Sequence, residues 1–254
     1  CMPPACPIRN NPMEYFADLH IHSCLSPCGD DDSTPNNIAG MGVLNGLNIM
    51  ALTDHNTCKN CPAFFAAAKK NGIIPIAGME LTTAEDIHVV CLFEQLDDAM
   101  AFSGAVDKKR IPIKNRIDIF GQQLILDEND EVIGHEDNLL SNATEVTIDE
   151  VPDMVRKFRG ICYPAHIDRE ANGILAVLGF FPPTPRFDII EFHDPERAEA
   201  IISKHNLQDK KVIMSSDAHY LWDIKEKREY FELDDEPYSS TLVRKRLFEH
   251  LRGE

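Results

Sequence analysis

Six short apolar runs in this chain each end in a histidine, an aspartate or a glutamate. The runs finish near His22, Asp54, Glu80, His166, His193 and Asp217, and stretches with helical signals separate most of them. Apolar runs that alternate with helices are typical of strands in a parallel sheet. The carboxyl ends of such strands lie at one edge, so these polar residues are expected to gather there. An open doubly wound sheet and a barrel both fit this pattern, and the number of histidines favours the barrel.

The stretches between the runs carry recognisable helix boundaries. Thr34-Pro35 is an N-cap followed by proline and predicts a helix to about Leu47, whereas Pro62 predicts a helix that ends at Asn71-Gly72. Further helices are expected at 97–106, at 195–205, at 240–251 and from the capping box 147–150 to 159.

One segment departs from this alternation. Within it, residues 122–126 are expected to pair with 131–134 as a hairpin across a polar turn. We therefore predict a single domain over residues 13–254, a small inserted hairpin and helix segment at about 95–144, and an N-terminal tail over residues 1–12.

The composition narrows the expected partners. The chain has 42 acidic and 25 basic residues in 254, a formal net charge of −17, which repels phosphate backbones, so general nucleic-acid binding is not expected. No run approaches the ~18–20 apolar residues of a membrane span and no signal peptide is recognisable, so we expect no membrane association and a cytoplasmic location. The 8 cysteines fit reduced thiols or metal ligands better than a disulfide framework. The sequence predicts no particular oligomeric state.

The polar residues at the ends of the runs form an ordered set of motifs. They are Asp18-Leu19-His20-Ile21-His22, Thr53-Asp54-His55, Gly78-Met79-Glu80, His88, Ala165-His166 and Ser216-Asp217-Ala218-His219. A His-x-His pair on a strand points both imidazoles to one side, which is a common start for a zinc, iron or manganese site. Each motif alone is weak evidence. Taken in this order, they resemble the motifs of the PHP (polymerase and histidinol phosphatase) family, from Tyr15 to about Tyr220 without the insertion.

The resemblance implies an α/β fold, a distorted (β/α)7 TIM-like barrel with up to three divalent ions at the strand carboxyl ends. By this resemblance His20, His22 and Asp217 would hold the first ion. Glu80 would bridge to a second ion held by His88 and His166, and His55 and His219 would hold a third. The expected cofactors are two to three divalent ions of zinc, manganese or iron.

Cys28 stands where several members of the family supply another histidine or an aspartate for the third ion. Cysteine favours zinc or iron, so Cys28 is a candidate ligand. The alternative is a spectator thiol, with Asp30 or water completing the ligand shell.

Three residues are candidates for catalysis, and Glu80 is the first because of its bridging position. Arg169 stands where the AHPxR pattern of nucleotide-hydrolysing members places an arginine that clamps phosphate, although Ile167 replaces the proline. A merely solvated loop arginine is the alternative. His193 is a candidate pocket residue and general acid, or else a core histidine. Asp54 is expected to orient His55 or a neighbouring ligand.

The resulting prediction is a metal-dependent phosphoesterase that hydrolyses a small soluble phosphate ester, a phosphomonoester or a nucleotide phosphodiester, with a metal-bound hydroxide as nucleophile. Two other classes stay open. An amidohydrolase also opens a barrel with His-x-His, although Glu80 and the Asp217-x-His219 ending favour the PHP pattern. A non-catalytic metal- or redox-sensing protein could use Cys24, Cys28, Cys58 and Cys61 as a four-thiolate site.

Overall fold

A computed structural model describes residues 12–27 and 29–254; residues 1–11 and the predicted ligand Cys28 lie outside the described residues. The largest sheet has six strands in the order β10-β1-β2-β3-β4-β7. These strands are β1 (Met13–Ile21), β2 (Ile49–Leu52), β3 (Ile74–Thr82), β4 (His88–Phe93), β7 (Ile161–Pro164) and β10 (Tyr230–Leu233). A parallel pair, β8 (Ile189–Phe192) and β9 (Lys211–Met214), and the hairpin of β5 (Leu124–Leu126) and β6 (Val132–His135) complete the strands of the described residues.

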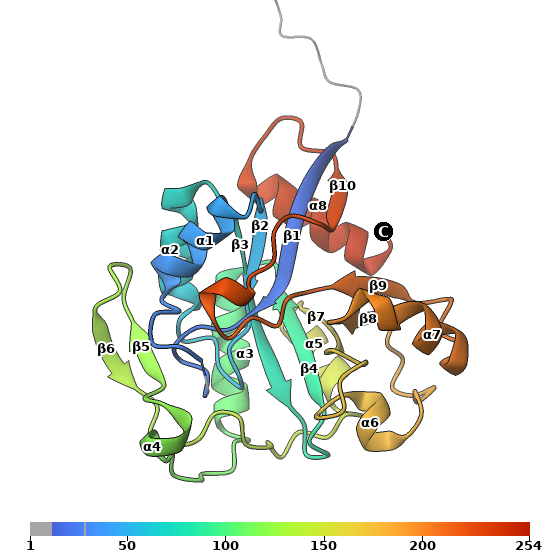
Figure 1. The fold of residues 1–254 in the computed structure, drawn as a ribbon, viewed down its shortest axis with the longest axis horizontal. Helices are drawn as coiled ribbons and strands as arrows, with labels where there is room; N and C mark the ends of the chain where they lie inside the picture. Colours follow the sequence, from blue (N-terminus) through green and yellow to red (C-terminus); the bar gives the residue numbers. More distant parts are fainter. Residues whose placement is uncertain (1–11, 28) are drawn as a thin grey trace, which may run out of the picture.

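Several helices lie within two residues of the predicted bounds, but the first ends at Leu44 and not at Leu47, and the helix expected from the capping box at 147–150 begins only at Val151. Thr34 caps α1 (Pro35–Leu44) by accepting a hydrogen bond from the backbone of Asn37, and Gly72 ends α2 (Cys61–Asn71) with a φ of 72°. The other helical elements are α3 (Leu96–Asp107), α4 (Ile117–Phe120), α5 (Val151–Lys157), α6 (Ile174–Leu178), α7 (Pro195–His205), the short 3₁₀ turn η1 (Leu221–Asp223) and α8 (Ser240–Arg252). Figure 1 shows α1, α2 and α3 on one side of the sheet, with β5, β6 and α4 set apart at one edge.

The two faces of the sheet pack against different partners. Along β2, Ile49 and Ala51 belong to one buried cluster, whereas Met50 and Leu52 belong to another that contains α1, α2, α3 and α5. The first cluster holds alternate residues of eight strands together with Leu247 and other residues of α8. This alternation is the period of two expected of a strand buried on both faces. The helix α8 thus covers the inner face of the sheet near the amino end of β1 (Figure 1).

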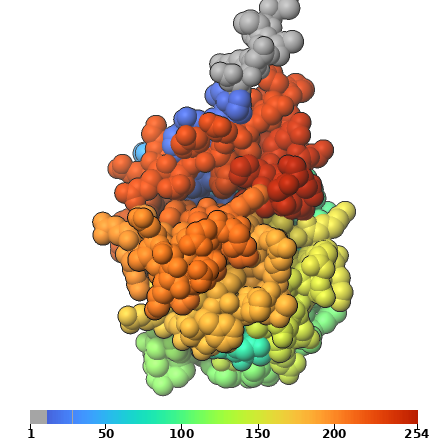
Figure 2. Space-filling view, turned by 90° about the vertical axis from the view of Figure 1, so that its right-hand side faces the viewer, coloured from blue at the N-terminus to red at the C-terminus, as the bar shows by residue number. Residues whose placement is uncertain are grey.

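The α/β fold is confirmed, but a closed (β/α)7 barrel is not. The six-stranded sheet curls as a half-barrel, and within the described residues no ladder joins β7 to β8. An isolated parallel bridge between Ile21 and Ala218 connects the segment after β9 with the end of β1. In the space-filling view the segment from α6 to β9, in orange, covers one side of the molecule below the red C-terminal segment (Figure 2).

The strand β4 runs antiparallel to both of its neighbours, β3 and β7. A short turn joins it to β3, and a connection of this length allows only a hairpin. The register places His88, at the start of β4, opposite Thr82 at the end of β3. His88 therefore lies at the same end of the sheet as the carboxyl ends of the parallel strands.

An irregularity in β1 sets the direction of the His-x-His pair. Tyr15 and Leu19 belong to the cluster on the inner face of the sheet, which includes residues of α8. Ile21 belongs to the cluster on the other face, which includes residues of α1 and α2, although odd positions of a regular strand share one face. The pairing of β1 with β2 shifts register between Asp18 and Ile21, as in a β-bulge. This shift turns the side chain of His20 to the inner side.

Within the described residues, no helix is long and apolar enough to cross a membrane.

Candidate metal centre

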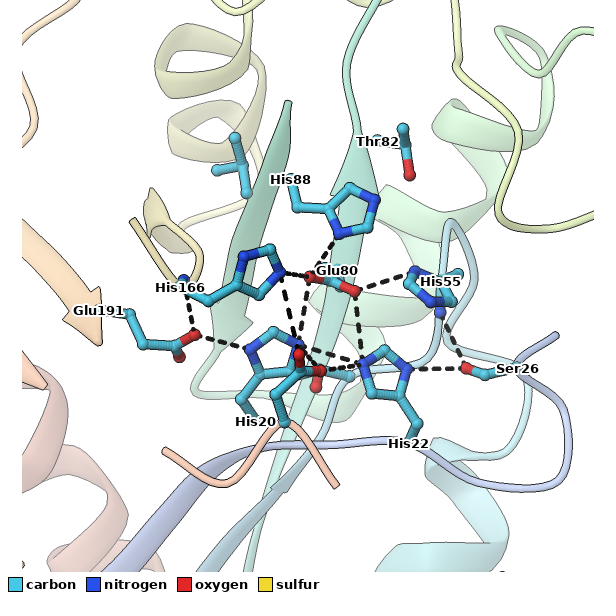
Figure 3. Close-up of polar contacts among 12 residues, drawn as sticks. His20, His22, Ser26, His55, Glu80, Thr82, His88, His166 and Glu191 are labelled. Atoms are coloured by element: carbon cyan, nitrogen blue, oxygen red, sulfur yellow. Dashed lines mark hydrogen bonds and ion pairs between the residues drawn. The ribbon is translucent and has the colours of Figure 1, made fainter. Parts of the chain in front are cut away.

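The strand ends bring the predicted ligands together at one buried place. The imidazoles of His20, His22, His55, His88 and His166 lie within 3.3 Å of the carboxylate of Glu80 (Figure 3). Asp217 and His219 of the last motif complete the cluster, which consists of His20, His22, His55, Glu80, His88, His166, Asp217 and His219. Glu80 is fully buried, and His219 lies at the rim. All the predicted ligands that the structure describes therefore lie in this cluster.

Glu80 occupies the centre of the cluster. Its Oε1 lies 2.8 Å from Nδ1 of His88 and 3.0 Å from Nε2 of His166, and its Oε2 lies 2.9 Å from Nδ1 of His55. Burial alone would raise the pKa of Glu80, but the charges of His88, His20 and His55 outweigh it and hold this pKa well below its usual range. The carboxylate is therefore ionised and faces several nitrogen atoms at once.

Several of the clustered atoms have no hydrogen-bond partner among the described residues. Nδ1 of His55, His88 and His166, Oε2 of Glu80 and Oδ1 of Asp217 are buried without one, although some lie near each other. Buried polar atoms are normally paired, so such a concentration requires an explanation. Nitrogen and carboxylate oxygen atoms are the ligands of zinc, iron and manganese, and bound cations would satisfy four of these atoms. The exception is Nδ1 of His166, because this ring faces Glu80 with Nε2. The residues present therefore fit a metal centre.

The potential ligand atoms fall into three overlapping groups, and within each group they lie within 4.8 Å of one another. The groups are His20, His22, Glu80 and Asp217; His55, Glu80 and His88; and His22, His55 and His219. Glu80 belongs to two groups, which is the arrangement of a bridging carboxylate. His166 belongs to none of the three, although its Nε2 contacts Oε1 of Glu80.

Glu191 orients His20. Its Oε1 lies 2.8 Å from Nδ1 of His20 and also accepts a hydrogen bond of 3.1 Å from the backbone nitrogen of His166. A carboxylate at Nδ1 fixes the proton on that nitrogen and leaves Nε2 free as a ligand. The residue was missed by the sequence analysis, although one signal could have found it. Glu191 is the charged residue in the otherwise apolar strand β8.

Asp54 and Ser26 orient His22 in the same way. The Ser26 hydroxyl donates to Oδ1 of Asp54 at 2.7 Å, so it accepts at 2.9 Å from Nδ1 of His22. It accepts a further hydrogen bond from the backbone nitrogen of His55. Nε2 of His22 therefore faces the cluster as a free acceptor. Asp54 acts through Ser26 on His22, a neighbouring candidate ligand, and Ser26 has no spacing signal in the sequence.

Two candidate ligands have unusual backbone conformations. The φ angles are 27° at His166 and 50° at Asp217. Both lie in the left-handed region of backbone conformation that residues other than glycine rarely adopt. Such conformations persist only where the surrounding structure holds them, and they concentrate at functional sites. The loops after β7 and β9 are thus shaped to direct these two side chains into the cluster.

An open pocket of about 420 Å³ leads to the cluster. Arg169 lines it, is 39 % exposed, and places Nη1 2.5 Å from Oδ2 of Asp217. His193 is not among its lining residues; it lines a smaller cavity beside Asp18. Burial, Arg169 and Lys225 lower the pKa of His193, which favours its neutral form. Arg169 is thus placed to contact a ligand in the pocket, whereas His193 lines a different cavity.

The cysteines that the structure describes do not join the cluster. Cys24, Cys58 and Cys61 are buried free thiols, and Cys58 donates to the backbone oxygen of Gly78. Burial raises the pKa of Cys58 well above its usual value, so the thiolate is disfavoured. None of the ligand groups formed by the described residues contains a cysteine, and Cys28 is not described.

Comparison with protein families gives one match, the PHP domain, over residues 18–178, which is more than half of the chain. Among curated relatives, the error-prone DNA polymerase of Symbiobacterium thermophilum is 36% identical over 77 residues, which cover 30% of this chain and 7% of the relative. The 5'-3' exoribonuclease of Haemophilus influenzae is 36% identical over 78 residues, which cover 30% of this chain and 27% of the relative. The chain thus matches less than a third of the length of either relative.

Solved structures share the fold over most of the chain. Endonuclease Q from Pyrococcus furiosus has a TM-score of 0.63 at 20% identity and covers 95% of this chain, which in turn covers 56% of the endonuclease. A putative metal-dependent phosphoesterase from Bifidobacterium adolescentis has a TM-score of 0.58 at 17% identity, with coverages of 93% and 96%. At these identities the likeness concerns the fold.

One comparison corrects the expectation about nucleic acids. An endonuclease Q structure with a TM-score of 0.61, 18% identity and coverages of 95% and 57% is a complex with a 27-mer duplex that carries an abasic lesion. The exclusion of general nucleic-acid binding, drawn from the net charge of this chain, is therefore wrong. Net charge sums the whole surface, whereas a phosphate meets the local field of cations.

The match over residues 18–178, with the ligand motifs gathered at one site, shows that this chain belongs to the PHP domain family.

Proposed function

We propose that this chain is a metal-dependent hydrolase of phosphate esters, with two to three divalent ions of zinc, manganese or iron at the cluster around Glu80. The observation that carries the proposal is a set of buried potential ligand atoms without a hydrogen-bond partner among the described residues. They belong to His55, Glu80, His88 and Asp217, which come from four separate segments. Membership in the PHP family supports a metal-dependent hydrolase.

The geometry supports the following ligand assignment. His20, His22 and Asp217 would hold the first ion, and Glu80 would bridge it to a second, held by His88. His166 would join the second ion, since its ring contacts Oε1 of Glu80. The third ion would lie between His55 and His219, with His22 close to both. The overlap of the groups at Glu80 and His22 favours ions that share ligands.

The residues around the ions would prepare the reaction. Bound divalent ions supply Lewis-acid sites for phosphoryl oxygens and make water a nucleophile near neutral pH. Glu191 and Ser26 would keep Nε2 of His20 and of His22 free of a proton. Arg169 would neutralise charge on the substrate phosphate, because its guanidinium lines the pocket and pairs with one oxygen of Asp217. The pocket is open, so a phosphate attached to a larger group can enter it.

We propose that the substrate is a phosphoester of a nucleotide, free or within a nucleic-acid strand. A DNA polymerase and an exoribonuclease are among the relatives, and an endonuclease shares the fold. A structure described as an amidohydrolase also shares this fold, at a TM-score of 0.58 and 17% identity, so amide hydrolysis is the competing activity.

The test is a substrate panel with the metal-loaded protein. It contains mononucleotides, single- and double-stranded oligonucleotides, ribose 5-phosphate as a simple monoester, and N-acyl amino acids as amides. Release of phosphate or a shortened oligonucleotide, lost on chelation and restored by metal, is the expected result. Turnover of amides alone would replace the proposal with amidohydrolase activity.

A further inference from the structure

An exposed aromatic pair follows the last candidate ligand. The rings of Tyr220 and Trp222 stack with centroids 4.8 Å apart and an interplanar angle of 18°. Tyr220 is 39% exposed and Trp222 is 72% exposed, and Trp222 is the single tryptophan of the chain. Neither ring therefore serves mainly to fill the core. The stacked partner restricts each ring, so the pair forms a preordered apolar surface in water.

The pair is close to the metal centre along the chain. Tyr220 directly follows His219, and Trp222 lies in η1, three residues beyond His219. Three residues span at most about 10 Å, so the Trp222 ring lies within reach of a group attached to a phosphate at the cluster. Asn45 at the end of α1 anchors this turn, because its side chain donates to the backbone oxygen of Ile224 at 2.6 Å.

A groove with basic side chains continues from Trp222. It has a volume of about 660 Å³, and its lining includes Trp222, Lys225, Lys227 and Arg228. Lys225 donates to the backbone oxygen of His193 at 3.1 Å and so lies between the groove and the cavity behind the metal centre. Three cations at positions 225–228, with Glu226 among them and also lining the groove, stand out on a chain of net charge −17. An aromatic surface beside cations suits a ligand with both a flat ring and negative charge.

We propose that Trp222, with Tyr220 behind it, stacks on an unpaired nucleobase of the substrate, while Lys225, Lys227 and Arg228 meet its phosphates. This proposal rests on the proposed function, because it names the part of the substrate that this site recognises. Stacking is tolerant of sequence because every base has a flat face. The platform therefore selects nucleotides over other phosphate esters without selecting one base.

Trp222 is the single tryptophan, so the tryptophan fluorescence of the protein reports on this ring alone. Ligand binding at the ring can therefore be measured without an activity assay. Its fluorescence is followed in the full chain during titration with adenosine monophosphate, octathymidylate and ribose 5-phosphate. Quenching by either nucleic-acid probe but not by ribose 5-phosphate supports the platform, and the probe that binds more tightly identifies a free nucleotide or a strand as the source of the base. No quenching by either nucleic-acid probe overturns it.

Substitution provides the second test. Trp222→Ala should raise Kd, measured by anisotropy of a labelled octathymidylate, by about 5- to 150-fold, and Trp222→Phe should recover part of the loss because it keeps a flat ring. Tyr238→Ala is the matched control, since Tyr238 is 63% exposed and follows β10, far from the carboxyl end of β1. Equal Kd values for Trp222→Ala and Tyr238→Ala would overturn the platform.

The two proposals fail in different ways. Quenching and a Trp222-dependent Kd without hydrolysis of any ester would leave the platform standing and remove the proposed function. Hydrolysis of esters with no quenching and no effect of Trp222→Ala would do the reverse.

Discussion

Replacing Glu191 tests whether the buried cluster holds metal in the geometry described. Glu191 accepts a hydrogen bond from Nδ1 of His20 at 2.8 Å and another from the backbone nitrogen of His166 at 3.1 Å, and its side chain is almost fully buried. In Glu191→Ala both donors lose their acceptor, and the proton of His20 is no longer fixed on Nδ1. Nε2 then carries the proton for part of the time and competes with the ion.

The expected magnitude follows from the position of Glu191 behind a ligand. Loss of such a partner typically weakens metal binding about 10- to 100-fold, or about 1.4–2.7 kcal/mol. Glu191→Gln should have a smaller effect, because an amide oxygen can still accept from His20. Its amide hydrogens would stand where Oε2 of Glu191 has no partner among the described residues, so some loss is expected.

The assay is competition for zinc between the metal-free protein and a chromogenic chelator, which gives both the number of ions and each Kd. Glu199→Ala is the control, since Glu199 is exposed on the following helix α7. One ion should bind more weakly in Glu191→Ala, with the far-ultraviolet circular dichroism unchanged. Wild-type Kd values for every ion would refute the assignment of His20 as a ligand held by Glu191.

Four further outcomes are expected. Elemental analysis after reconstitution should find two to three equivalents of transition metal, and fewer than one would contradict a multinuclear centre. Glu80→Gln should lower hydrolysis more than about 100-fold with the fold intact, because two cations would share a site without their bridging charge; near wild-type turnover would exclude bridging. Arg169→Ala should lower kcat/KM for phosphate esters about 10- to 150-fold, and Arg169→Lys should recover part of it, whereas wild-type kinetics would limit Arg169 to its ion pair with Asp217. Cys58→Ser with Cys61→Ser should leave the metal content unchanged, and loss of an equivalent would restore the thiolate site.

The parts of the site that local chemistry determines could be predicted from the sequence. His20, Glu80 and Asp217 are recognisable because each ends or follows an apolar run, and a strand end has a defined place in an α/β fold. The helices α1 and α2 were predictable for a similar reason, since Thr34 and Gly72 act within one turn. These signals require only short-range geometry.

The remaining features depend on contacts between distant segments. Glu191 and His20 are 171 positions apart, and neither has a motif that refers to the other. The hydroxyl of Ser26 resembles any loop serine until the fold places Asp54 and His22 on either side of it. A closed barrel was predicted because the number of apolar runs indicates the number of strands. The runs do not indicate which strands pair with each other. The net charge misled because it says nothing about the local field at Arg169.

The hairpin of β3 and β4 has a consequence for the order in which the site can form during folding. Glu80 and His88 stand on its two arms, joined by a short turn, so their meeting closes only a small loop of chain. His20 and Glu191 must close a loop of 171 positions, which costs more chain entropy. Local contacts of this kind generally form earlier than non-local ones. The contact between Glu80 and His88 is therefore expected to form before the histidines of the other strands reach it.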